Sequence, residues 1–165
     1  MPRRLAMGVV IRRATVQDAD GIAQAHVDSI QTLGARAYDA EVIADWGAPR
    51  TGERYRLRIA DGAELFVAVE NGRIVGLSDY RAIDGSHRTG IFVRGDAARR
   101  GIGTALFAEA EAAARRHGAT EINVDASLGA VGFYEANGFE RVGDGEHTLR
   151  NGRRMSCVYM RKRLQ

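Results

Sequence analysis

The fold is decided by the stretch Phe92-Val93-Arg94-Gly95-Asp96-Ala97-Ala98-Arg99-Arg100-Gly101-Ile102-Gly103-Thr104-Ala105-Leu106-Phe107. It begins in a short apolar run over residues 90–94, which is typical of a β-strand. A basic turn with glycines follows from Gly95 to Gly103. An alanine-rich segment without proline then runs from Ile102 to His117, with apolar residues three or four positions apart. This spacing predicts a helix with one apolar face, and Gly118 is placed to end it.

Strand, glycine turn and helix in this order form an arrangement suited to binding an anion. The first N–H groups of a helix have no partner within the helix, and the N-terminal end carries partial positive charge. Glycines let a phosphate approach the backbone, and Arg99 and Arg100 add full positive charge. A tight turn that simply leads into a packed helix is the alternative interpretation. The turn therefore suggests a phosphate site without establishing one by itself.

The composition is that of an ordinary globular protein. The chain has 165 residues, of which 45% are hydrophobic and 27% charged. This length suffices for one domain with a sizeable core, so we expect a single domain over residues 1–165 with its core from about residue 9 to 164. The lone Cys157 excludes an internal disulfide framework and fits a reducing cytosol, so we expect a cytoplasmic protein. There is no Cys/His cluster, so we expect no metal.

The charge and hydropathy patterns exclude two classes of partner. No segment is long and apolar enough to span a membrane, and the run up to Ile11 is too short for a signal peptide, although Met1 and Met7 are both compatible with being the natural start. The net charge is +3, but no basic block or aromatic-basic alternation occurs. We therefore expect neither a membrane nor a nucleic-acid partner. Nearly all the positive charge is arginine, since Lys162 is the single lysine; a genomic base bias or a polyanionic cofactor explains this equally well.

Hydrophobic periodicity places the remaining elements. Strands are expected at Val9–Arg13, Glu64–Val69, Ile74–Tyr80, Arg88–Arg94, Glu121–Ala126, Phe139–Val142 and Arg153–Arg161, the last two joined by a connection rich in Gly, Asp and Asn. Helices are expected from the Thr15/Asp18 capping box to Ile30, at Ala40–Trp46, Gly52–Ile59 and Leu128–Asn137, in addition to Ile102–His117. Asn71-Gly72 and Asp84-Gly85 read as turns. The order predicts an α/β fold of the α+β kind, in which a mixed, mostly antiparallel central sheet is flanked by helices.

A second motif, Ser127-Leu128-Gly129-Ala130-Val131-Gly132-Phe133-Tyr134-Glu135-Ala136-Asn137-Gly138-Phe139, carries a family resemblance. It resembles the Asn-x-x-Ala-x-x-Phe-Tyr-x-x-x-Gly-Phe pattern of the GCN5-related N-acetyltransferase (GNAT) superfamily, with Ser127 where Asn is common. The glycine turn resembles the same family's pyrophosphate loop, Gln/Arg-x-x-Gly-x-Gly/Ala. Gly101 and Gly103 match its small positions, and Ala98 departs from its first position. The two motifs stand in the family's order, about 30 residues apart.

The resemblance covers the chain from about Val9 to Leu164 and implies the GNAT acyl-CoA N-acyltransferase fold. It implies acetyl-CoA as co-substrate and direct acetyl transfer to a primary amine of a small molecule or peptide, and it leaves a homodimer open. The cofactor-binding residues that it implies are Phe92, Val93, Arg94, Ala98, Arg99, Arg100, Gly101, Ile102, Gly103, Thr104, Ser127 and Phe133. Tyr134 corresponds to the family's tyrosine that points at the sulfur, which makes it the expected catalytic acid.

The chemistry of such a transfer sets out what else to look for. An alkyl amine has a pKa of about 10.4 and a thiol of about 8.5, so the ammonium must lose a proton and the sulfur often gains one. Asp79, His87 and Asp125 are candidate bases near strand ends, and a water chain is an equal alternative. Each of the three also reads as a solvated or structural polar residue, and Tyr134 as a core aromatic. Direct transfer needs no nucleophile at Cys157, which reads as packing.

The acceptor site is expected between the first two helices and at the hairpin loops. His26, Ser29, Tyr38 and Trp46 are its polar or aromatic candidates, and two of these, His26 and Trp46, also fit the packed faces of helices. The departures at Ala98 and Ser127 and the absence of an obvious base leave a second function open. In that interpretation the chain is a non-catalytic acyl-CoA-binding module with a sensing or regulatory role.

Overall fold

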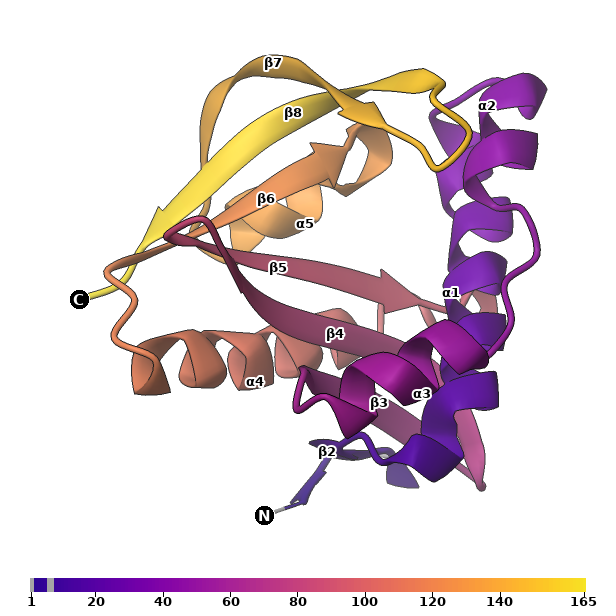
Figure 1. The fold of residues 1–165 in the computed structure, drawn as a ribbon, viewed down its shortest axis with the longest axis vertical. Helices are drawn as coiled ribbons and strands as arrows, with labels where there is room; N and C mark the ends of the chain where they lie inside the picture. Colours follow the sequence, from indigo (N-terminus) through magenta and orange to yellow (C-terminus); the bar gives the residue numbers. More distant parts are fainter. Residues whose placement is uncertain (1, 6–7) are drawn as a thin grey trace.

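The computed structural model describes residues 2–5 and 8–165, so both candidate starts, Met1 and Met7, lie outside the described residues. One eight-stranded sheet runs through the molecule in the order β1-β2-β3-β4-β5-β6-β8-β7 (Figure 1). Its strands are β1 (Arg3–Arg4), β2 (Val10–Arg13), β3 (Glu64–Glu70), β4 (Arg73–Ile83), β5 (Ser86–Val93), β6 (Glu121–Ser127), β7 (Glu140–Thr148) and β8 (Arg154–Arg163). The helices are α1 (Ala19–Thr32), α2 (Ala40–Trp46), α3 (Glu53–Ala60), α4 (Ile102–Arg116) and α5 (Val131–Ala136). Short 3-10 turns occupy Val16–Asp18, Gly34–Arg36, Gly95–Ala97 and Leu128–Ala130.

The sheet consists of two antiparallel halves joined by one parallel contact. Strands β1 to β5 form one half, and β6, β8 and β7 form the other. Between the halves, β5 and β6 are parallel and pair at a single register position, Arg88 opposite Asn123. Figure 1 shows the two strands separating beyond this point. The middle of the sheet is therefore open on one side of the contact.

The alternation of β3 explains how helices cover both faces of the sheet. Leu65 and Val67 belong to the core that includes α1 and α3, whereas Phe66 and Ala68 belong to the core that includes α4. Successive side chains of a strand point to opposite faces, so α4 covers one face and the pair α1 and α3 the other. The predicted apolar stripe of α4 is confirmed, since Ile102, Leu106, Ala110 and Ala113 are all buried.

The predicted mixed sheet with helices on both sides is confirmed, and so are its turns. Asn71 and Gly72 join β3 to β4 with φ of 49° and 75°, and Asp84 and Gly85 join β4 to β5 with φ of 48° and 78°. Positive φ at both central residues is the signature of the tight hairpin turn that Asn-Gly and Asp-Gly favour. None of the helices formed by the described residues is long and apolar enough to cross a membrane.

The prediction was wrong at the C-terminal hairpin. Strand β7 does not end at Val142 but continues to Thr148, paired with β8 through to Arg154. The region expected to be a connection, with Gly143, Asp144 and Gly145, is therefore part of the strand. Strand β7 lies at the edge of the sheet, so its side chains are mostly exposed and show no apolar alternation in the sequence. Backbone hydrogen bonds to β8 hold the strand in place. The short strand β1 was also missed, for the same reason.

Close packing of α4 on β4 depends on Gly76. A Cβ atom at this position would lie 2.9 Å from Leu106 Cδ1 and 3.1 Å from the Phe92 carbonyl oxygen. We predict that Gly76→Val lowers the free energy of unfolding by about 1–3 kcal/mol, because overpacking forces the helix and strand apart. Chemical denaturation measures the loss. Gly143→Val is the matched control, since a Cβ at Gly143 meets nothing within 4 Å, and an equal loss in both variants would contradict the packing argument.

Candidate functional site

Two pockets meet where β5 and β6 separate. The first, called here the loop pocket, has a volume of about 620 Å³ and lies against the glycine turn before α4. The second, called here the arginine pocket, has a volume of about 430 Å³ and lies against α3 and the β7–β8 hairpin. Both pockets are lined by Trp46, Ile91, Phe92, Ser127, Ala130 and Tyr134. The six shared residues form the passage from one pocket to the other.

The loop pocket contains the N-terminal end of α4. Gly101 caps this helix with φ of 78°, and no side chain accepts from the first turn. The N–H groups of Ile102, Gly103 and Thr104 therefore have no partner within the helix. A Cβ on Gly103 would lie 2.9 Å from Phe133 Cε2, so glycine is needed for the ring to pack against this turn. The result is a set of bare backbone donors at a positively polarised helix end.

Most of the residues implied by the resemblance line the loop pocket. They are Phe92, Val93, Ala98, Arg99, Gly101, Gly103, Thr104, Ser127 and Phe133. Three others do not line it. The buried Arg94 donates to the Ile74 carbonyl at 2.9 Å, Arg100 pairs with Glu70 at 2.8 Å, and the Ile102 side chain is buried in the core. These contacts hold the three side chains away from the loop pocket, so only the backbone of these positions can face it.

The edge of β5 that faces the opening carries alternate backbone groups. The Arg94 N–H donates to the Val75 carbonyl on β4 at 2.8 Å, whereas the Ile91 N–H faces the Tyr134 hydroxyl. Because successive N–H groups of a strand point to opposite edges, the Val93 N–H lies on the same edge as that of Ile91. Of Phe92, Val93 and Arg94, which the resemblance implies as cofactor-binding residues, only Val93 thus has its N–H on the cleft edge, together with Ile91.

Tyr134 stands at the junction of the two pockets. Its side chain is 4% exposed, and burial raises the pKa of its hydroxyl well above the ordinary value. A raised pKa keeps the proton on the oxygen throughout the physiological range. Tyr134 is therefore a buried proton donor that both pockets can reach.

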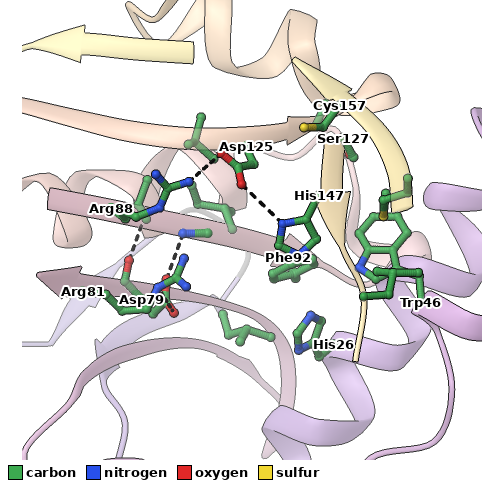
Figure 2. A pocket seen from close by; sticks show the side chains of 18 of the residues that line it. His26, Trp46, Asp79, Arg81, Arg88, Phe92, Asp125, Ser127, His147 and Cys157 are labelled. Carbon is green, nitrogen blue, oxygen red and sulfur yellow. Dashed lines mark hydrogen bonds and ion pairs between the residues drawn. The ribbon is translucent and has the colours of Figure 1, made fainter. Parts of the chain in front are cut away.

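Ion pairs occupy one end of the arginine pocket. Asp79 accepts from Arg58 at 3.0 Å and pairs with Arg81 at 3.1 Å, while Asp125 on β6 accepts from Arg88 on β5 at 2.6 Å. Figure 2 shows Asp79 with Arg81 and Asp125 with Arg88 on the same side of the pocket. The two carboxylates that were predicted as bases thus line the pocket, but each is already bound to arginine.

Two histidines also line the arginine pocket. His147 Nδ1 lies 3.3 Å from Asp125 Oδ2, and the His147 hydrogen bond and Arg88 together lower the pKa of Asp125. The sequence analysis missed His147 because β7 was expected to end before it. His87, the third predicted base, is not among the residues that line either pocket; its Nδ1 lies 2.6 Å from Tyr80 Oη.

His26 projects from α1 toward Phe92, and the ring centroids are 3.9 Å apart (Figure 2). Its Nδ1 lies 2.5 Å from Tyr55 Oη. Burial, together with the positive charge of four nearby arginines, holds the pKa of His26 well below its ordinary value. The arginines are Arg50, Arg54, Arg58 and Arg150. The imidazole is therefore neutral at physiological pH, and its surroundings oppose a gain of charge.

The remaining candidates divide between lining and structural roles. Trp46 lines both pockets and Ser29 the loop pocket. Tyr38 lines neither: its hydroxyl donates to the Ser156 carbonyl and accepts from the Leu128 N–H, which fastens the start of α2 to the second half of the sheet. Cys157 is 2% exposed, and burial raises the pKa of its thiol to about 11. A protonated thiol is a poor nucleophile, in keeping with the packing role expected for it.

Comparisons with known proteins agree with this geometry. The family model of the acetyltransferase (GNAT) domain matches residues 34–164. The chain belongs to the GNAT acetyltransferase family. No curated protein matches the sequence. This membership confirms the resemblance carried by the two motifs.

Solved GNAT structures share the fold over nearly the whole chain. The GCN5-related N-acetyltransferase "Aminotransferase, Class-II" from Rhodopseudomonas palustris is 26% identical with a TM-score of 0.84, over 98% of this chain and 100% of its own. The ribosomal-protein-alanine N-acetyltransferase from Brucella melitensis is 25% identical with a TM-score of 0.70, over 93% and 99%. The PaiA N-acetyltransferase from Thermoplasma acidophilum, solved in complex with coenzyme A, is 18% identical with a TM-score of 0.74, over 96% and 100%.

The depressed pKa of His26 has a consequence for stability. An unfolded histidine has a pKa of about 6.5, so below that pH the unfolded GNAT chain binds a proton that folded His26 refuses. Stability is therefore lost as the pH falls through 6.5. We predict that wild type loses about 1 kcal/mol more unfolding free energy between pH 7.5 and pH 5.5 than His26→Gln does, measured by urea denaturation. Equal losses in the two proteins would show that His26 titrates normally.

Proposed function

We propose that this GNAT protein is an acetyl-CoA-dependent N-acetyltransferase that moves an acetyl group directly to a primary amine of a small molecule or peptide. One observation carries the proposal: a buried, protonated Tyr134 hydroxyl lies where the loop pocket and the arginine pocket adjoin, and it lines both. A transferase needs two substrates to meet at a proton donor, and this arrangement supplies the meeting point.

The residues of the loop pocket fit the cofactor. The Phe133 ring packs closely against Gly103, and the first-turn N–H groups of α4, which have no partner within the helix, suit phosphate oxygens. Ala98 removes a side chain from this contact, but backbone donors need none. Arg99 lines the same pocket and adds the positive charge that the departure at Ala98 omits. The volume of about 620 Å³ lies in the range of small-molecule sites.

Acetyl-CoA supplies the acetyl group already activated as a thioester. In our proposal the Val93 N–H, on the open edge of β5, donates to the thioester carbonyl and stabilises negative charge that develops there. The Tyr134 hydroxyl donates its proton to the sulfur as the thiol leaves. Ser127, which lines the passage, offers a hydroxyl where the family commonly has an amide. Direct transfer involves no covalent step on Cys157.

The amine must lose a proton before it attacks. We propose that His147 receives this proton, directly or through water, because its imidazole lines the arginine pocket and its Nδ1 lies 3.3 Å from the Asp125 carboxylate, which orients the ring. Asp125 is a weaker acceptor, because the His147 hydrogen bond and Arg88 lower its pKa, and the Asp79 carboxylate is already paired with Arg58 and Arg81. His26 is weaker still, because burial and the surrounding arginines oppose its protonation.

Replacing Tyr134 tests the central step of the proposal. We predict that Tyr134→Phe lowers kcat for thiol release by about a hundredfold, since general acid catalysis is worth about 10²–10⁴. The acetyl-CoA Kd, measured by calorimetry, should stay within about twofold because the ring and the loop pocket remain. Tyr159→Phe is the control: this hydroxyl bonds Glu146 and is outside both pockets.

The outcomes separate the two candidate functions. An unchanged kcat in Tyr134→Phe would remove the acid role from this residue. Acetyl-CoA binding by wild type without release of thiol for any amine in a broad panel would favour the non-catalytic acyl-CoA-binding module. Absence of acetyl-CoA binding would contradict both functions.

A further inference from the structure

Within the part of the chain that the structure describes, three arginines of the arginine pocket have no carboxylate partner. Arg58, Arg81 and Arg88 are paired with Asp79 or Asp125, as described above. Among the described residues no Asp or Glu forms an ion pair with Arg50, Arg54 or Arg150, which line the same pocket. Since no Lys and no Glu lines the pocket, its six arginines outnumber its two carboxylates, and it carries a net positive charge.

Arg50 shows most clearly that a partner is lacking. Its Nη2 donates to the Trp46 carbonyl at 3.1 Å, but its buried Nη1 has no hydrogen-bond partner. A buried charged donor without an acceptor is costly, and native proteins seldom keep one unless something else fills the position. Burial lowers the pKa of Arg50, and the charges of Arg150 and Arg54 lower it further. The guanidinium is therefore held where an anion would stabilise it.

The unpaired arginines reach one region from two sides. Arg50 precedes α3 and Arg54 lies within it. Arg150 lies in the loop between β7 and β8. Burial lowers the pKa of His26, which lies at the wall of the pocket beside Phe92 (Figure 2), and the positive charges of all three arginines lower it further. Two segments about 100 positions apart in sequence thus place positive charge around one space. Guanidinium groups suit carboxylate and phosphate oxygens because their N–H donors form a planar fork.

We infer that the acceptor is a small amine that carries an anionic group, a carboxylate, phosphonate or phosphate, held by Arg50, Arg54 and Arg150. The inference rests on the proposed transferase function and names the substrate class of that site. A pocket of about 430 Å³ holds a small molecule, and the three unpaired arginines line it together with Tyr134 and His147. In this inference the anionic group meets the arginines and the amine lies toward Tyr134 and His147.

The same charge assists the chemistry. Positive charge near an amine disfavours the ammonium form, so the arginines lower the pKa of the bound amine while they hold its anionic group. An amine without an anionic group would still have its pKa lowered, but the arginines would not hold it and it would bind weakly. The phosphates of the cofactor are assigned to the loop pocket, on the far side of the passage, so they leave these arginines free.

Three amines of similar length test the inference: 3-aminopropylphosphonate, 4-aminobutyrate and butylamine. Thiol release gives kcat/KM for each with acetyl-CoA, and calorimetry gives their binding to protein saturated with coenzyme A, which fills any phosphate site of the loop pocket. The variants are Arg50→Gln and Arg54→Gln; Arg54 is exposed, so its replacement leaves the core intact. Arg56→Gln is the matched control on the same helix, since Arg56 pairs with Glu53 and does not line the pocket.

We expect kcat/KM for at least one anionic amine to exceed that for butylamine by about tenfold or more, which is the scale of one charge-assisted contact. Arg50→Gln and Arg54→Gln should each remove about tenfold of this preference, Arg56→Gln none. A better rate with the phosphonate than with the carboxylate would identify a phosphate-like group, and the reverse a carboxylate. Turnover with no preference for the anionic amines would overturn the inference and leave the transferase function standing.

Binding separates the remaining cases. Saturable binding of an anionic amine that weakens in Arg54→Gln, without turnover of any amine, would support the anion site and contradict the transferase function. Absence of arginine-dependent binding to the coenzyme-saturated protein would overturn the inference irrespective of turnover.

Discussion

The structure depends on one interrupted contact in the middle of its sheet. Strands β5 and β6 pair only at Arg88 and Asn123 and then separate. The Arg88–Asp125 ion pair, at 2.6 Å, ties the two strands just beyond this register position. Past it, backbone groups of β5 face an opening in place of a neighbouring strand. Buried backbone donors and acceptors require partners, so this edge needs a side chain or a ligand to complete it.

Tyr134 and the helix ends follow from that opening. The Tyr134 hydroxyl faces the Ile91 N–H and completes one position of the edge, while the Val93 N–H remains for a ligand. Helix α4 presents bare N–H groups on one side of the opening, and the arginine pocket lies on the other. Both sides are electropositive for different reasons. On the loop side the field comes from backbone dipoles, and on the acceptor side it comes from guanidinium side chains.

How far the sequence predicts this arrangement depends on whether a feature is formed by residues close together in the chain or by segments far apart in it. The glycine turn, the stripe of α4 and the two hairpin turns are local patterns, and all of them were predicted. Tyr134 was predicted through its motif. His147 was missed because the edge strand β7 carries no apolar alternation. The group formed by Arg50, Arg54 and Arg150 could not be foreseen either, because nothing local marks arginines that meet only when α3 and the β7–β8 loop come together.

The same limit applies within the loop itself. A motif specifies positions, but it does not say which side chains turn inward. Arg94 and Arg100 are among the cofactor-binding residues implied by the resemblance, but neither side chain lines the loop pocket. Each is held instead by a partner from the β3–β4 region, the Ile74 carbonyl and Glu70. The motif was informative about the backbone, and tertiary contacts decided the side chains.

The most direct test of this account is a crystal structure of the protein with acetyl-CoA. We predict the pyrophosphate oxygens within hydrogen-bond distance of the N–H groups at Ile102 to Thr104, and the sulfur beside the Tyr134 hydroxyl. The thioester carbonyl should accept from the Val93 N–H, with the arginine pocket left open to solvent. A complex in which the phosphates occupy the arginine pocket, or in which β5 and β6 close without the cofactor between them, would contradict the account.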